Sequence, residues 1–151
     1  MSDTKDPIPT IEGQAGVSDP VELAWAFPDV APGQQPYGGR VIVQLRRIKK
    51  KAGLIIIVDE TKENEKWNNM IGKVVSIGPL AFKNRDTMAS WPEGSWANVG
   101  DFVRVPRWGG DRWERPVPNE DGKDPVLLMT INDHELIAKV TDDPLSFKAY
   151  V

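Results

Sequence analysis

Short stretches of alternating hydrophobic and polar residues recur along the chain, and they predict β-strands. The clearest are residues 41–45 and 73–77, where β-branched side chains follow a period of two and glycine bounds the run. Apolar runs at 102–106, 125–131 and 136–140 lie between turn residues and predict three more strands. Together they predict an all-β fold, a small β-barrel with long loops.

Turn residues separate the predicted strands. Asn119–Lys123 contains Asp-Gly, which accepts positive φ at low cost and predicts a hairpin-type turn. Residues 91–96 hold Pro-Glu-Gly between two tryptophans, which predicts a reversal whose rings face each other or a partner. Residues 108–113 predict a second turn flanked by tryptophans, and residues 132–135 predict a polar turn.

An apolar tetrapeptide stands inside the long polar connection between the first two predicted strands. It consists of Leu54, Ile55, Ile56 and Ile57. A basic run precedes it and a polar run of mixed charge follows it, so it has no local apolar neighbours to bury against. We therefore expect either the inner face of a third strand or a tag presented to another protein.

Composition divides the chain into three parts. Residues 1–34 are interrupted repeatedly by proline and glycine, which predicts an extended N-terminal arm. Residues 35–141 contain all the predicted strands and are assigned to the barrel. Residues 142–151 form a short C-terminal tail.

One segment of the predicted arm differs from the rest. Asp19 is suited to cap a helical turn with Pro20 at its first position. Leu23, Trp25 and Phe27 are large apolar residues in an otherwise polar region. They either pack onto the chain's own barrel or anchor the arm on a neighbouring subunit or partner.

Composition excludes several classes of protein. Hydrophobic residues are 40% and charged residues 27% of the 151 residues, as in globular domains. The net charge of −3 does not favour a nucleic-acid binder. There are no cysteines, which excludes disulfide scaffolds and zinc-thiolate sites. No run is long enough to span a membrane and no export signal is recognisable, so we expect a soluble protein made without export.

Three further features are assigned surface or packing roles. The basic run 46–51 could contact phosphates, but we expect a solvated strand end or a ring-interface patch. The tryptophans beside Gly and Pro turns are expected to pack at a barrel end or form a protein interface, rather than stack on bases. His134, alone in a polar turn, is expected to be exposed and to bind no metal.

The order of these pieces resembles the GroES-type co-chaperonins. The motifs that carry the resemblance are, in chain order, Gly39–Val43, Lys50–Ile57, Gly72–Gly78, Val99–Val103, Asp121-Gly122 with Val126–Met129, and Glu135–Val140. No single motif is specific to the family. Their order along most of the chain is what makes the resemblance hard to obtain by chance.

The resemblance implies a β-barrel that assembles into a seven-membered ring. In that family an apolar tripeptide in a mobile loop docks on the large chaperonin ring, which uses ATP while the cap encloses a folding client. Carried over by position, the chaperonin-binding residues are Ile55, Ile56 and Ile57, preceded by Leu54. A cap of this kind needs no catalytic residue, metal or cofactor.

The chain also departs from the family pattern. Leu54 stands where the family has a second glycine, and the polar connection after the tripeptide is longer than usual. The region 91–118, at and after the position of the family's roof-type hairpin, holds four tryptophans, and the arm and tail have no counterpart. Phage-encoded co-chaperonins show such long loops, so the resemblance implies a viral member whose client is a capsid protein.

Two functions remain open, and neither is enzymatic. The first is a co-chaperonin-like lid in the cytoplasm, that of the host if the protein is viral. The second is a virion structural protein, a capsid decoration or cement bound to the major capsid protein through its arm. The same barrel occurs in zinc-dependent alcohol dehydrogenases, but those need Cys and His ligands and a G-x-G-x-x-G nucleotide domain. This chain has no Cys, one His and no such domain.

Overall fold

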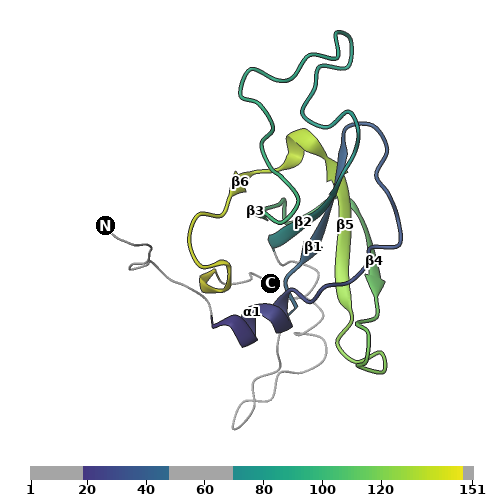
Figure 1. The fold of residues 1–151 in the computed structure, drawn as a ribbon, viewed down its shortest axis with the longest axis vertical. Helices are drawn as coiled ribbons and strands as arrows, with labels where there is room; N and C mark the ends of the chain where they lie inside the picture. Colours follow the sequence, from purple (N-terminus) through teal and green to yellow (C-terminus); the bar gives the residue numbers. More distant parts are fainter. Residues whose placement is uncertain (1–18, 48–69, 148–151) are drawn as a thin grey trace.

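The computed structural model describes residues 19–47 and 70–147. The strands in these ranges form one antiparallel sheet (Figure 1). Its strands are β1 (Arg40–Leu45), β2 (Ile71–Ile77), β3 (Phe102–Arg104), β4 (Asp111–Arg115), β5 (Val126–Asn132) and β6 (Ala138–Lys139). They lie in the order β4-β5-β1-β2-β3-β6. The other elements are the α-helix α1 (Pro20–Ala26) and two 3-10 helices, η1 (Asp133–Glu135) and η2 (Pro144–Ser146). The prediction of a mainly β fold is confirmed.

Each of the five predicted strands has a counterpart, but the turn predicted at 108–113 is wrong in its second half. Gly109 and Gly110 turn with positive φ of 100° and 70°, and β4 then begins and pairs with β5. β4 lies at one end of the sheet, and none of its residues is fully buried. It therefore carries no apolar period by which the sequence could identify it. β6 covers only two residues of the predicted closing strand.

The middle of the sheet is buried on both faces. Five of the six residues of β1 are buried, and so are five of the seven in β5. One face packs into the main core, whose strand residues are Val41, Val43, Leu45, Val74, Val103, Leu127, Met129 and Ile131. Ile42 and Leu128 alternate with these and pack on the other face against Val30 and Val117. This double burial explains why β1 and β5 read as nearly continuous apolar runs.

Residues 28–32 help to cover the second face of the sheet. The Gln44 side chain, only 2% exposed, donates from Nε2 to the Pro28 carbonyl at 2.8 Å. The Trp113 indole N–H donates to the Pro32 carbonyl at 2.9 Å. Buried polar groups must find partners, so these hydrogen bonds fix the segment against β1 and β4.

The predicted cap of helix α1 is confirmed. The Asp19 side chain accepts a hydrogen bond from the Val21 N–H at 2.9 Å, and Pro20 holds the first helical position. The apolar side of the helix packs onto the chain's own sheet, since Phe27 is 5% exposed and meets Phe102 edge-to-face at 5.0 Å.

Leu23 and Trp25 pack against the same cluster as Phe27 and remain half-buried. Within the chain, these three residues therefore pack onto their own sheet, which agrees with the first of the two alternatives. Their use as anchors on a partner stays a prediction.

The two ends of β1 lie in different surroundings. Figure 1 shows α1 and the connection between β4 and β5 near the end where β1 finishes. The long loop between β2 and β3 and the helix η1 lie near the end where β1 begins. In the described ranges, no helix has the length and apolar character needed to cross a membrane.

Candidate functional site

The predicted chaperonin-binding residues, Leu54, Ile55, Ile56 and Ile57, lie outside the described residues. The structure does describe the two points between which their connection runs. Leu45 at the end of β1 is paired with Gly72 in β2, and the Arg46 N–H donates to the Ile71 carbonyl at 3.1 Å. The connection that carries the tetrapeptide therefore starts and finishes at one end of the β1–β2 pair.

Arg47 follows the end of β1 and is enclosed by the protein. The residue is 6% exposed, and its guanidinium donates to both carboxylate oxygens of Glu120, at 2.7 and 3.2 Å. It also donates to the carbonyls of Trp25 at 2.7 Å and Asp124 at 2.8 Å. The Trp25 ring lies against the guanidinium, 4.2 Å from centroid to Cζ.

The backbone joins this arrangement, which we call the Arg47 clamp: Arg47, Trp25, Glu120 and Asp124. The Arg47 N–H donates to the Ala26 carbonyl at 3.0 Å, next to the C-terminal end of α1. The clamp thus joins three segments distant in sequence: α1, the end of β1 and the turn after β4. Arg47 was expected to be solvated with the rest of the basic run, and for this residue the expectation is wrong.

Charge pairing stabilises the ionised form of Glu120 in the clamp. The hydrogen bonds from the Arg47 guanidinium, aided by its positive charge, lower the pKa of the Glu120 carboxyl from its ordinary value. The bidentate fork is the geometry in which arginine binds a carboxylate most strongly. Arg47 therefore acts as a structural cation in the folded chain.

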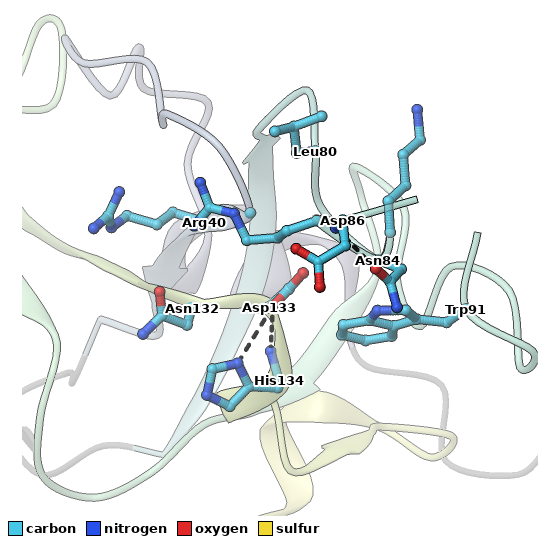
Figure 2. Close-up of a pocket in the computed structure, with 11 residues that line it drawn as sticks. Arg40, Leu80, Asn84, Asp86, Trp91, Asn132, Asp133 and His134 are labelled. Carbon is cyan, nitrogen blue, oxygen red and sulfur yellow. Dashed lines mark hydrogen bonds and ion pairs between the residues drawn. The ribbon is translucent and has the colours of Figure 1, made fainter. Parts of the chain in front are cut away.

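The opposite end of β1 borders a pocket of about 380 Å³ (Figure 2). Three regions line it: Gly39 and Arg40 at the start of β1, residues 80–91 in the loop after β2, and Asn132 to His134 where β5 meets η1. The pocket thus gathers residues that the sheet order brings to one end.

Asp133 forms a rigid part of the pocket wall. It is 7% exposed, and its carboxylate accepts hydrogen bonds from the N–H groups of Phe82 and His134, each at 2.8 Å. Its own N–H donates to the Gly39 carbonyl at 2.9 Å. The carboxylate therefore serves to hold the loop and η1 against β1.

His134 points to solvent beside this carboxylate. Its side chain is 68% exposed, with Nδ1 3.5 Å from the Asp133 Oδ1 atom. The expectation of an exposed histidine is confirmed. In the parts of the chain that the structure describes, no three His, Cys, Asp or Glu side chains gather where they could hold a metal ion.

Aromatic packing supports the loop on the other side of the pocket. The Trp91 and Trp96 rings meet edge-to-face with centroids 4.8 Å apart, and Phe82 lies 5.4 Å from Trp91. The Gly94 N–H donates to the Trp91 carbonyl at 2.7 Å, which closes the turn between the two tryptophans. The predicted reversal with facing rings is confirmed.

Comparison of the chain with models of protein families gave no match, and comparison with curated proteins gave none either. The resemblance to co-chaperonins therefore depends on the order of motifs in the sequence.

Sequence reasoning missed both the Arg47 clamp and the pocket. The hydrogen-bond partners of the Arg47 side chain lie 22, 73 and 77 residues away along the chain, and no local pattern connects them. The pocket residues come from three separate segments, and several were assigned to turns. For Arg47 no local signal was available, because a charged residue is rarely buried unless it is paired, and its partners are distant in sequence.

Proposed function

We propose that the protein is a co-chaperonin-like lid, a GroES-like barrel that forms a ring and binds a large chaperonin ring while that ring uses ATP. The docking residues are Ile55, Ile56 and Ile57, with Leu54 before them. The supporting observation is the placement of their connection, which starts and finishes at adjacent ends of β1 and β2. A tag on such a connection is presented from one end of each subunit, as docking of a ring requires.

The physical basis of the proposed interaction is multivalency. A short apolar tag contributes a small contact area and therefore a low affinity on its own. Several identical tags on one ring bind together firmly, and they still release when the chaperonin changes state. The enclosed client, a capsid protein in the proposed viral setting, folds in the chamber without any catalytic group from the lid.

The experiment is ATP-dependent co-sedimentation of the full chain with a chaperonin ring, combined with light scattering to measure the mass of the lid. Ile56→Asp is expected to abolish co-sedimentation, because a buried carboxylate cannot replace an apolar docking side chain. Ile137→Asp is the matched control, since Ile137 is 57% exposed and lies just before β6.

Equal binding by the wild type and the Ile56→Asp variant would reject the docking role. A monomeric mass for the wild-type protein would reject the ring. A loss of binding in both isoleucine variants would show a general loss of structure instead of a docking site, and circular dichroism identifies that case.

The second candidate function is a virion structural protein, with the major capsid protein as its partner. The seating of α1 on the sheet favours it, because Leu23 and Trp25 keep part of their surface open while Phe27 is fixed inside. Leu23→Asp places a charge on the open part of this surface and is expected to abolish capsid binding if Leu23, Trp25 and Phe27 anchor the arm. Unchanged capsid binding by this variant would reject these residues as the anchor.

A further inference from the structure

Three cationic side chains gather around the pocket at the start of β1. They are Arg40 at the first position of the strand, and Lys83 and Arg85 in the loop after β2. All three residues are exposed. The cluster is notable in a chain whose net charge is −3.

These cations have no internal partner within residues 19–47 and 70–147. No hydrogen bond or ion pair within those ranges satisfies the side chain of Arg40, Lys83 or Arg85. Two carboxylates, Asp86 and Asp133, line the same pocket, and the oxygens of Asp133 accept from the backbone N–H groups of Phe82 and His134. The three cations outnumber these two carboxylates, so the lining offers a net positive charge to an anion.

Neutral polar groups extend the same site. The Asn84 Oδ1 atom accepts from the N–H groups of Asp86 and Thr87 at 2.8 and 3.1 Å. The side-chain NH₂ group of Asn84 therefore remains a donor for a ligand. Asp86 also lines the pocket, and its carboxylate would accept a hydrogen bond from a ligand hydroxyl group.

We propose that this pocket binds a small molecule that carries a phosphate or carboxylate group together with hydroxyl groups, such as a sugar phosphate or a hydroxy acid. Arg40 and Arg85 would hold the anionic group through paired N–H donors, a geometry that suits phosphate and carboxylate oxygens alike. Lys83 adds charge, while Asn84 and Asp86 recognise the neutral polar part. The volume of about 380 Å³ lies in the range of small-molecule sites.

Contacts within the chain hold the wall of the pocket. The hydrogen bonds of Asp133 hold the loop and η1 to β1, and the Trp91 ring is packed against Phe82 and Trp96. A ligand would therefore order mainly the three exposed cationic side chains, so the conformational cost on the protein side is mainly their lost rotamer freedom.

The test is isothermal titration calorimetry of the full chain with four probes: glucose 6-phosphate, citrate, inorganic phosphate and glucose. We expect the two hydroxyl-bearing anions to bind more tightly than inorganic phosphate, and glucose to give no saturable heat. Binding should weaken as sodium chloride is raised, because salt screens charge interactions at the surface. The phosphate and citrate arms distinguish a preference for phosphate from one for carboxylate.

Removal of single cations sharpens the test. Arg40→Gln and Arg85→Gln are each expected to weaken binding about tenfold, the usual effect of losing a hydrogen bond to a charged group. Lys123→Gln removes the same charge from an exposed position outside the pocket and should leave the affinity unchanged. Lys83→Gln, expected to give a smaller loss, keeps the test valid if an arginine variant fails to fold.

Three results would overturn the proposal. They are the absence of saturable heat with every anion, an affinity that survives all three pocket substitutions, and an equal loss in Lys123→Gln. Light scattering at each ligand concentration provides a further check. Anion heat that only accompanies a change of mass, with no saturation at constant mass, would assign the effect to assembly and reject the pocket.

Discussion

Arg40 and Arg47 stand at the two ends of the same strand, and the protein uses them in opposite ways. Arg47 is enclosed by Trp25, Glu120 and Asp124, with its donors directed at carbonyl and carboxylate oxygens. Arg40 is exposed at the edge of the pocket and has no side-chain partner within the described ranges. The residue type alone therefore does not determine whether an arginine is structural or available to a ligand. The groups that surround it decide.

The largest expected effect is the difference between the two arginines in their contribution to the free energy of unfolding. Arg47→Ala should lower the free energy of unfolding by about 3 kcal/mol, because it removes the donor from two part-buried carbonyls and from the Glu120 carboxylate. Arg40→Ala should change it by less than about 0.5 kcal/mol, as surface substitutions usually do. Urea denaturation measures both variants. Equal effects of the two substitutions would show that the Arg47 clamp does not stabilise the fold.

The next expected effect concerns the backbone at the pocket end. A Cβ atom at Gly78 would collide with the carbonyl oxygen of Gly38, and neither backbone segment can move away easily. Gly78→Ala should therefore cost roughly 2 kcal/mol or more. Gly94→Ala is the control, since φ there is +75° but a Cβ meets no atom within 4 Å, and only backbone strain of about 1 kcal/mol is expected.

Thermal denaturation of the two glycine variants gives the comparison directly. A Gly78→Ala variant as stable as Gly94→Ala would mean that the two backbone segments can separate at this end. The pocket wall would then be less rigid than the structure indicates, and the low ordering cost assigned to ligand binding would lose its basis.

A smaller effect is expected inside the pocket wall. Asp133→Asn keeps the size of the side chain, but its one carbonyl oxygen cannot accept from both the Phe82 and His134 N–H groups. The expected loss is about 1 kcal/mol, the usual contribution of one hydrogen bond. His134→Ala should have almost no effect on unfolding, because the side chain is 68% exposed. Urea denaturation tests both, and a larger loss in His134→Ala would contradict this assignment.

The strands could be predicted where their side chains are buried, and not where they are exposed. β1 and β5 carry apolar runs because both of their faces are covered, and the sequence reveals them. β4 reads Asp-Arg-Trp-Glu-Arg and depends on pairing with β5 for its strand structure, which a local pattern cannot reveal. The helix cap at Asp19 was predictable because capping involves residues adjacent in sequence.

The candidate sites depend on contacts between distant segments, and this limits what a single sequence can predict. The Arg47 clamp joins residues from α1, β1 and the turn after β4, and a basic run offers no sign that one of its members is enclosed. The pocket depends on the order of strands, which places Arg40 beside Asn132 across the β1–β5 pair. The tetrapeptide is the reverse case, because its role was predicted from sequence and its residues lie outside the described part of the chain.

The stability contributed at the two ends of β1, by the Arg47 clamp and by Arg40, should depend differently on pH. The folded chain lowers the pKa of the Glu120 carboxyl through its hydrogen bonds with Arg47, so it favours the ionised form. The stabilisation is complete above the ordinary carboxyl pKa of about 4.3, and it is lost as pH falls through the lowered folded value.

In thermal denaturation from pH 7 to pH 3, the wild type should therefore exceed Glu120→Gln in stability by a margin that shrinks with acidification. Arg40→Gln should show a constant margin over the same range, because no carboxylate is paired with Arg40 among the described residues. A constant margin for Glu120→Gln would instead mean that the Glu120 charge contributes nothing to the clamp, and that Arg47 is held by the carbonyls and the Trp25 ring alone.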